Sequence, residues 1–218
     1  MIKQIKPIAH IKNGYKDKFG IPRQSGNTLV LSTIEFEKEF RVDCAIKEIE
    51  GFSHLWLIFG FSKNDGKYLL SVRPPRLGGN KKVGVFASRS PFRPNGLGLS
   101  SVKLERVERG KLIVSGADLL DGTPIYDIKP YLTFTDCHID AKCGYAQEFF
   151  DYKLKVENTK LLDEMENSIK LDVINSLALD PRPSYQDDEN RIYGMTYDKY
   201  NIKFTVKGDT LYIKSVEQ

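Results

Sequence analysis

Short apolar runs separated by turn residues fill the first two thirds of the chain. They lie at residues 5–11, 28–36, 54–61, 68–74, 82–88, 99–107, 111–120 and 125–134, with Gly, Pro, Asn and Asp between them. Several runs alternate apolar and polar positions, as in LSSVKLERV at 99–107. Brief alternating runs with frequent turn signals are typical of β-barrels and β-sandwiches rather than of βαβ units. The pattern predicts a mainly β domain, with one helical piece around residues 44–51.

The hydrophobic period changes after about residue 155. Apolar residues then recur at helical spacing on one face, at Leu162, Met165, Ile169 and Val173. The acidic residues Asp163, Glu164 and Glu166 would occupy the first turns of this helix, where the helix dipole favours negative charge. We expect Asp180-Pro181 to end the helix, because proline cannot continue it.

The last segment alternates again and predicts a β-hairpin. Apolar positions 202, 204 and 206 face apolar positions 211 and 213 across the turn Lys207-Gly208-Asp209. Together, the patterns predict two modules, a β domain to about residue 140 and a small α+β domain from about residue 155.

Composition sets only broad limits on function. The 218 residues are 40% hydrophobic, enough for a substantial core, and 33 basic against 29 acidic residues give a net charge of +4. This mild excess permits a polyanionic partner without requiring one. No leader-like segment and no long apolar run is visible, so we expect no signal peptide and no membrane span. Three cysteines do not resemble a secreted disulfide framework, and we expect a reducing cytoplasm.

The common metal, nucleophile and nucleotide motifs are weak or missing. Cys137, His138 and Cys143 could supply three zinc ligands, but they lack a fourth ligand and a CxxC pair, so we predict no metal site. No G-x-S-x-G nucleophile elbow occurs, and we interpret His54 as a structural residue at a strand edge. Neither GxGxxG nor a P-loop is present, so any cofactor must be held in another way.

Loops rich in Pro, Arg and Asp interrupt the apolar runs. They are PRQ at 22–24, RPPRLGG at 73–79, SRSPFRPNG at 88–96 and DLLDGTP at 118–124. Proline fixes φ and lowers the cost of holding a loop in one shape, and glycine lets a ligand approach the backbone. Arginine offers a planar fork to carboxylate or phosphate oxygens. One such loop alone would be an ordinary turn, but several in one domain predict a preformed site for an anion.

Longer motifs in the same regions resemble a known family. VRPPRLGGN at 72–80, GVFASRSPFRPNGLGLSSVKL at 84–104, LLDGTPIYDIKPYL at 119–132 and LDPRPSY at 179–185 look like the TrmO family, also called TsaA-like or YaeB-like. The likeness covers nearly the whole chain, beginning with IPRQSG at 21–26. It implies an S-adenosylmethionine-dependent tRNA methyltransferase acting on N6 of N6-threonylcarbamoyladenosine (t6A) at position 37, next to the anticodon, to give m6t6A.

The resemblance also implies where the cofactor binds and how the protein assembles. It implies an N-terminal β-barrel domain at 1–145 that binds S-adenosylmethionine, beside a small α+β C-terminal domain at 146–218, in a homodimer. The positions that match the family's cofactor segments are Pro22, Arg23, Gln24, Ser62, Lys63, Arg89, Leu99, Asp118, Leu119, Leu120, Asp121 and Gly122.

The chemistry of methyl transfer suggests catalytic groups. Transfer from a sulfonium requires an in-line approach and an available lone pair. N6 of the expected substrate is part of a urea, so removal of its proton should help the attack. We hypothesise that Asp121 or Asp127 orients the substrate or accepts this proton, with Tyr126 and Lys129 as alternative polar groups. The competing interpretation is that Asp121 only forms a turn and that Asp127 only pairs with Lys129.

Basic and aromatic residues are expected to contact the tRNA. Guanidinium groups suit the threonyl carboxylate and the anticodon-loop phosphates, and an aromatic ring can stack an unpaired base. The residues in question are Arg73, Arg76, Arg89, Arg93, Lys81, Lys82, Lys129 and Phe92, and the likeness adds Arg182 and Tyr185 as groups that help close the substrate site.

Two other functions use the same features. A non-catalytic RNA-binding β-barrel would use the basic loops for phosphate contacts and stacking. A sensor would bind the adenosyl cofactor without chemistry. Heat on titration with S-adenosylmethionine separates the RNA binder from the others, and methyl transfer to tRNA separates the enzyme from the sensor.

Overall fold

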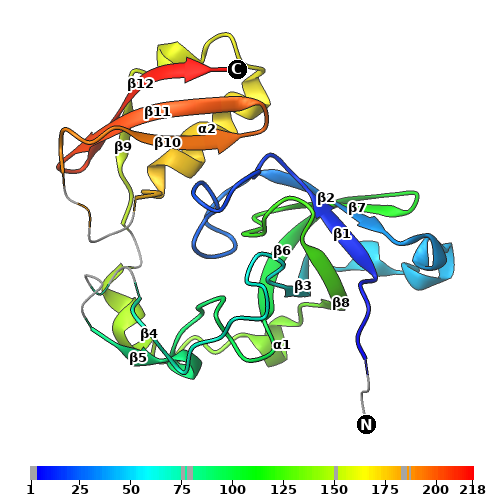
Figure 1. Cartoon of the computed structure of the whole chain (residues 1–218). Coiled ribbons are helices and arrows are strands. Elements are labelled where there is room, and N and C mark those ends of the chain that lie inside the picture. Colours follow the sequence, from blue (N-terminus) through cyan, green and yellow to red (C-terminus); the bar gives the residue numbers. More distant parts are fainter. Residues whose placement is uncertain (1–3, 75–76, 78–80, 150–151, 183–185, 187) are drawn as a thin grey trace.

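The strands of the protein form a barrel, a second sheet and a small ribbon. A computed structural model describes residues 4–74, 77, 81–149, 152–182, 186 and 188–218 (Figure 1). In these ranges, every helix is too short or too polar to traverse a lipid bilayer. The prediction of a mainly β fold, with a β-barrel followed by a small α+β domain, is confirmed.

The barrel closes from six antiparallel strands. In spatial order they are β1 (Ala9–Lys12), β2 (Leu31–Phe36), β7 (Lys111–Ser115), β6 (Leu97–Glu108), β3 (His54–Gly60) and β8 (Pro124–Pro130), and β8 pairs back with β1. Successive side chains of a strand point to opposite faces. In β3, Leu55 and Leu57 are therefore buried inside the barrel, whereas His54, Trp56 and Ile58 lie on its outer wall.

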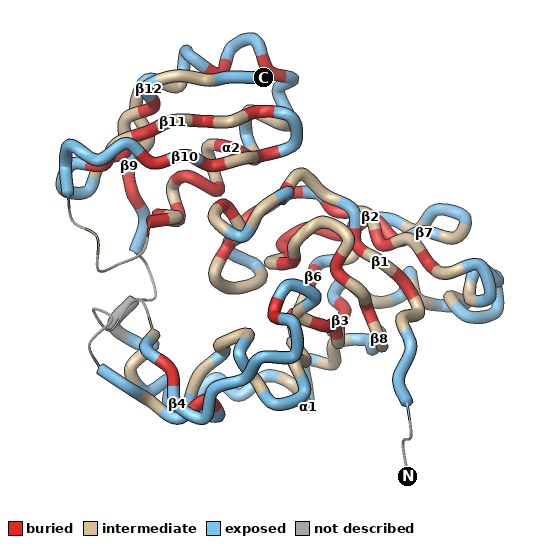
Figure 2. The backbone as a smooth tube through the Cα atoms, viewed as in Figure 1, coloured by how far each residue is buried: buried red, intermediate tan, exposed pale blue. Residues whose placement is uncertain are grey.

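The second sheet has a helix on one face. Its order is β10 (Tyr193–Tyr197), β11 (Tyr200–Lys207), β12 (Thr210–Glu217) and β9 (Lys155–Glu157), with β9 parallel to β12. Helix α2 (Asn167–Ala178) packs Val173 and Leu177 into one core with Ile202 and Phe204. Figure 2 shows this core as the buried segments of α2, β10 and β11.

Short elements complete the fold. The two-stranded ribbon pairs β4 (Ser71–Val72) with β5 (Val83–Gly84). In the part of the chain that the structure describes, the shorter helices include α1 (Thr133–Asp136) and the 3-10 turns Lys38–Phe40, Asp43–Ala45, Ile49–Gly51, Val85–Ala87, Gly144–Phe149 and Thr159–Leu162. The predicted domain boundary between residues 145 and 146 falls within Gly144–Phe149 and stays a prediction.

The structure corrects the helix predictions in detail. The piece around 44–51 is two 3-10 turns rather than one helix. Leu162 and Met165 are buried, but α2 begins only at Asn167, because Glu166 has an extended backbone. The acidic residues 163, 164 and 166 therefore precede the helix instead of occupying its first turn. The helix ends at Ala178, just before Asp180-Pro181, and the hairpin over residues 200–217 is confirmed.

A segment of the barrel domain joins the two domains. Tyr15 is fully buried in the core of the second sheet and meets Tyr197 edge to face, with ring centroids 5.3 Å apart. The Tyr15 hydroxyl lies 3.1 Å from the Ser176 hydroxyl of α2. Gly14 packs so closely on Tyr197 that a Cβ there would approach the ring to 2.4 Å. Residues 13–24 are thus anchored to the C-terminal domain before they reach the site described next.

Candidate functional site

A cleft of about 1220 Å³ lies on the outer wall of the barrel. Trp56 and Ile58 of β3 form its floor, opposite Ser101 and Leu99 of β6. Directly paired residues of neighbouring strands present their side chains to the same face, so these residues form one surface. Small-molecule pockets measure roughly 300–1,000 Å³. The cleft therefore has room for a cofactor and part of a second ligand.

Loops far apart in the sequence form the walls of this cleft. They are residues 21–25, 61–64, 88–93 and 118–120. The Asn64 side chain donates to the Pro91 carbonyl at 2.6 Å, and the Phe61 amide donates to the Gly96 carbonyl at 2.8 Å. These bonds tie the proline-rich loop to the end of β3. The predicted convergence of Pro- and Arg-bearing loops is therefore observed for three of the four loops. Of the fourth, at 73–79, the described residues Arg73, Pro74 and Leu77 do not line the cleft.

Most positions that the family likeness assigns to the cofactor lie together in this cleft. The lining residues among them are Pro22, Arg23, Gln24, Ser62, Lys63, Arg89, Leu99, Asp118, Leu119 and Leu120. Asp121 and Gly122 follow directly but do not line it. That these residues bind the cofactor stays a prediction. The prediction requires them to lie in one pocket, and they do.

Asp118 places a carboxylate in the cleft wall. Burial raises the pKa of Asp118, although the Ser100 hydroxyl donates a hydrogen bond to its Oδ1 and Arg89 lies nearby. A half-buried carboxylate with spare acceptor capacity suits a ligand that carries hydroxyl or ammonium groups.

Arg89 and Arg23, which both line the cleft, have different partners. Arg89 donates from Nη1 to the Gln24 side-chain oxygen at 2.6 Å, which links two of the loops. Arg23 donates from Nη2 to the carbonyls of Arg182, at 2.5 Å, and Asp180, at 3.3 Å. Arg23 thereby connects the cleft to the C-terminal domain.

Asp121 and Gly122 hold the turn behind the cleft. Lys16 lies 3.0 Å from Asp121 Oδ2, and the Asn13 amide donates to Oδ1 at 3.1 Å. Burial alone would raise the pKa of Asp121, but these donors outweigh it and the pKa is lowered. Gly122 has a φ of +76°, a conformation that favours glycine. These contacts match the interpretation of Asp121 as a turn-forming residue.

Tyr126, Asp127 and Lys129 of β8 lie beside the floor of the cleft. Asp127 pairs across the sheet with Ile58, and Lys129 with Trp56, so both share the outer wall with the floor. The Lys129 ammonium lies 2.8 Å from Asp127 Oδ2. Tyr126 sits where the β3–β8 register shifts, and its ring lies against Gly60. None of the three lines the cleft itself.

The predicted tRNA-binding residues are dispersed. Arg93 lines the cleft, but its Nη1 donates to the carbonyls of Ser88 (2.7 Å) and Val85 (3.1 Å) and holds the loop in shape. Phe92 and Arg73 are exposed outside the lining. Arg76 and Tyr185 lie outside the described residues.

Arg182 is buried in the C-terminal domain. Its guanidinium donates to Asp180 from Nε at 2.9 Å and from Nη2 at 3.0 Å, and the Tyr152 hydroxyl donates to the same carboxylate at 3.0 Å. The Arg182 side chain is only 8% exposed. The contact of Arg182 with the cleft residue Arg23 is therefore made by its backbone carbonyl, while its guanidinium binds Asp180.

Sequence reasoning missed one end of the cleft. Ser53, His54, Trp56, Tyr131 and Thr133 line it there. The rings of Trp56 and Tyr131 have centroids 5.4 Å apart, and those of His54 and Tyr131 are 6.2 Å apart. The alternation of HLWLIF carried a signal for this end, because it turns Trp56 away from the barrel core that Leu55 and Leu57 fill.

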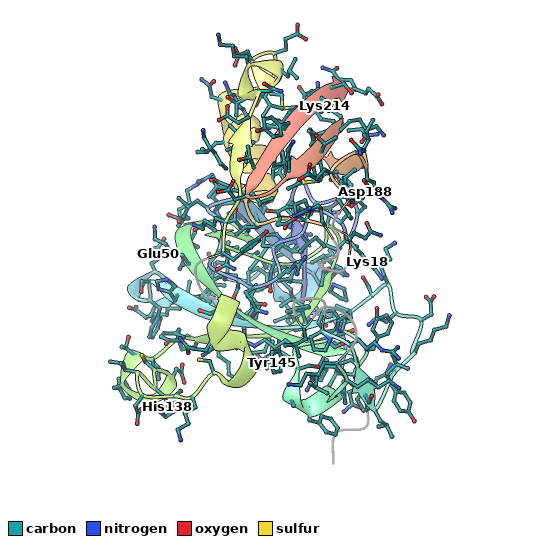
Figure 3. The ribbon with its side chains drawn as sticks, turned by 90° about the vertical axis from the view of Figure 1, so that its left-hand side faces the viewer. Lys18, Glu50, His138, Tyr145, Asp188 and Lys214 are labelled. Carbon is teal, nitrogen blue, oxygen red and sulfur yellow. The ribbon has the colours of Figure 1, made fainter. Side chains whose placement is uncertain are left out.

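The residues considered for zinc lie elsewhere. Cys137 and Cys143 are exposed free thiols. His138 is labelled on the segment after α1 in Figure 3, and Tyr145 of the same segment donates to the Ala87 carbonyl at 3.1 Å. Among the residues whose structure is described, no three His, Cys, Asp or Glu side chains are grouped as metal ligands.

Comparisons with known proteins agree with this architecture. The tRNA-methyltransferase O N-terminal domain matches residues 10–137, and the TrmO C-terminal domain matches residues 150–218. An Escherichia coli K12 protein described as tRNA (adenine(37)-N6)-methyltransferase is 38% identical over 220 residues, covering 93% of each chain. A Pseudomonas aeruginosa PAO1 protein described as putative S-adenosylmethionine-dependent methyltransferase RcsF is 39% identical over 205 residues, covering 89% of each.

Solved structures extend the agreement to the whole fold. The crystal structure of TrmO from Pseudomonas aeruginosa has a TM-score of 0.78 at 31% identity, and a second TrmO crystal structure has 0.79 at 32%. Both cover all of this chain and all of their own. The chain, with its six-stranded barrel, its outer-wall cleft and its small C-terminal sheet, therefore belongs to the TrmO (tRNA-methyltransferase O) family.

Proposed function

We propose that this protein transfers a methyl group from S-adenosylmethionine to N6 of t6A at position 37 of tRNA, giving m6t6A. The observation that carries the proposal is the convergence of residues 22–24, 62–63, 89 and 118–120 around Leu99 in one cleft. Membership of a family whose relatives include tRNA (adenine(37)-N6)-methyltransferases supports the reaction class.

The residues of the cleft fit the chemistry of the cofactor. Ile58 and Leu99 offer an apolar floor to the adenine ring. The Asp118 carboxylate can accept hydrogen bonds from hydroxyl or ammonium groups, and the Arg89 guanidinium can donate to a carboxylate. When bound, S-adenosylmethionine supplies an electrophilic methyl group on a cationic sulfonium, so neither a metal nor an acyl intermediate is needed.

Asp127 is the group we propose to orient the acceptor nitrogen or take its proton. Its pairing with Ile58 puts it on the cleft's sheet face, one strand from the floor. The Lys129 contact holds the carboxylate on that face. Tyr126, beside Gly60, is the neighbouring polar group. Asp121, held by Lys16 and the Asn13 amide, would act by positioning the 118–122 loop.

The surface around the β4–β5 ribbon suits the unpaired bases and phosphates of the anticodon loop. Tyr68, Phe86 and Phe92 expose aromatic rings there, and Phe86 lies under Arg93 with 5.9 Å from the guanidinium to the ring centroid. The Leu69 amide donates to the Phe92 carbonyl at 3.1 Å, which ties the ribbon to the loop. Exposed rings with basic neighbours, here Arg73, Lys81 and Lys82, bind single-stranded nucleic acid by stacking and charge.

Methyl transfer to paired tRNA substrates tests the proposal. The purified protein and S-adenosylmethionine are incubated with the same tRNA carrying or lacking the threonylcarbamoyl group, and nucleosides are identified by mass spectrometry. We expect methylation only of the t6A form. Equal methylation of unmodified tRNA would contradict the substrate, and binding of S-adenosylmethionine without any transfer would favour the sensor. RNA binding without S-adenosylmethionine binding would favour the non-catalytic barrel.

Assembly and location follow the family likeness. We propose a homodimer in the cytoplasm, in which Arg182 and Tyr185 help to close the substrate site. Sedimentation of the purified protein tests the dimer, and a monomer at micromolar concentration would contradict it.

A further inference from the structure

The aromatic end of the cleft has no assigned ligand. Strand β3 advances by about 3.3 Å per residue, so its first residue, His54, lies about 20 Å along the floor from Gly60. The proposed cofactor residues Ser62 and Lys63 follow Gly60, and Leu99 pairs with Ile58 near the middle of the strand. The rings at the His54 end therefore lie on the side of Ile58 and Leu99 that faces away from Ser62 and Lys63, on the same continuous floor.

The side chains at this end are oriented for stacking. The Trp56 indole N–H donates to Asp136 of α1 at 2.8 Å, and the Leu132 amide donates to the same oxygen at 2.9 Å. These two donors hold the pKa of Asp136 below its usual range, so the acceptor stays charged. The hydrogen bond thereby holds the indole next to Tyr131, with the two ring planes inclined by 44°. A fixed pair of accessible rings in a cleft can bind a planar ligand at little entropic cost.

Basic and hydroxyl groups surround these rings. Lys129 pairs across the sheet with Trp56, and Lys103 pairs with His54, so both are on the outer wall beside the rings. Ser101 and Thr133 add hydroxyl groups to the lining. The combination of stacking surface, cationic flank and hydroxyl groups is complementary to a nucleotide.

We infer that Trp56 and Tyr131, flanked by His54, form a second subsite that stacks the target nucleobase of the RNA. This inference rests on the proposed function, which requires one base to enter the cleft beside the methyl donor. A target base in an RNA loop can be splayed out and stacked on aromatic side chains. The subsite then presents the acceptor nitrogen toward the middle of β3, where Asp127 pairs with Ile58.

The chain offers a direct readout of this subsite. Trp56 is its single tryptophan, so intrinsic tryptophan fluorescence reports on this position alone. The probes are an anticodon stem-loop RNA carrying t6A and, separately, S-adenosylmethionine. The variants are Tyr131→Ala, the conservative Tyr131→Phe, and Tyr212→Ala on the second sheet as a matched control away from the cleft.

The expected pattern separates base stacking from other roles. The stem-loop should quench Trp56 fluorescence. Tyr131→Ala should raise its Kd by about 5-fold to 150-fold, the usual range for losing one base–aromatic stack. Tyr131→Phe and Tyr212→Ala should bind it like the wild type, and S-adenosylmethionine affinity should be the same in all variants.

Other outcomes would overturn the inference. Unchanged RNA affinity in a folded Tyr131→Ala variant would exclude the stack, and a fall in S-adenosylmethionine affinity instead would assign the rings to the cofactor. If Tyr131→Ala fails to fold by circular dichroism, His54→Ala replaces it with the same expectation of weaker RNA binding. Failure of the wild type to methylate t6A tRNA would reject the proposed function instead, because the binding titration does not depend on turnover.

Discussion

Replacing Arg182 tests whether the C-terminal domain supports the cleft through a buried ion pair. Arg182 and Asp180 form two hydrogen bonds of 2.9 and 3.0 Å, and their side chains are only 8% and 11% exposed. Arg182→Ala leaves the Asp180 carboxylate buried without its cation, while the bonds from the Tyr152 hydroxyl, at 3.0 Å, and from the amide of residue 182, at 3.3 Å, remain. Removing one partner of a buried pair typically costs about 3–5 kcal/mol. Since domains are stable by only about 5–15 kcal/mol, this is a large share.

The same substitution should reach the cleft through Arg23. The Arg23 guanidinium binds the carbonyls of residues 180 and 182, so a displaced loop releases it. We therefore expect Arg182→Ala to weaken S-adenosylmethionine binding as well as tRNA binding. A loss confined to tRNA would instead favour a direct contact of Arg182 with the substrate.

Urea unfolding followed by circular dichroism, together with calorimetric titration of S-adenosylmethionine, measures both effects. The matched control is Lys6→Ala, because the Lys6–Glu39 pair is 2.7 Å long but 65% and 57% exposed. Exposed pairs contribute about 0–1 kcal/mol. An Arg182→Ala variant that is no less stable than Lys6→Ala would refute the reasoning.

Three further substitutions probe the cleft and its support. Burial raises the pKa of Asp118, so the folded protein holds the Asp118 proton more tightly than the unfolded chain does. The free energy of unfolding therefore falls as the pH rises through the pKa of Asp118 in the folded protein, and the ionised carboxylate is destabilising at neutral pH. Asp118→Asn should therefore raise the melting temperature at neutral pH and weaken S-adenosylmethionine binding; unchanged values of both would contradict its placement. Gly14→Ala should lower stability by about 1–3 kcal/mol, since its Cβ would approach the Tyr197 ring to 2.4 Å, whereas Gly51→Ala, with open space, should not; equal melting temperatures would be the contrary result. Asp127→Asn should reduce methyl transfer by about 100-fold or more if it takes the proton, and near-normal turnover would remove Asp127 from the chemistry.

Local patterns predicted the fold well where neighbours in sequence decide the structure. The hairpin over residues 200–217 depends on alternation and on a turn whose Gly208 has a φ of +57°, and both are visible in the sequence. The predicted helix begins too early, because Leu162 and Met165 continue the apolar spacing of α2 although they lie in a 3-10 turn and in the segment that follows it. Spacing alone cannot separate these conformations, since both bury the same side chains.

The site was only partly predictable, because its parts are joined by non-local contacts. The family motifs indicated Arg89 and Asp118, and both line the cleft. No feature of the sequence around residue 182 shows that the Arg182 guanidinium forms an ion pair with Asp180. The alternation of buried and more exposed side chains in β3 defines its two faces, but it does not identify the loops that cover the outer face. The position of Trp56 in the cleft therefore depends on contacts with Tyr131 and with Asp136 of α1, which its own stretch of sequence does not show.

A crystal structure of the protein with S-adenosylmethionine tests the central claim most directly. We expect ligand density over Leu99, between Arg89 and Asp118, with the methyl group directed along the floor of β3 toward Trp56. Density at any other surface of the barrel, or a cofactor lying on the Trp56 and Tyr131 rings, would contradict it.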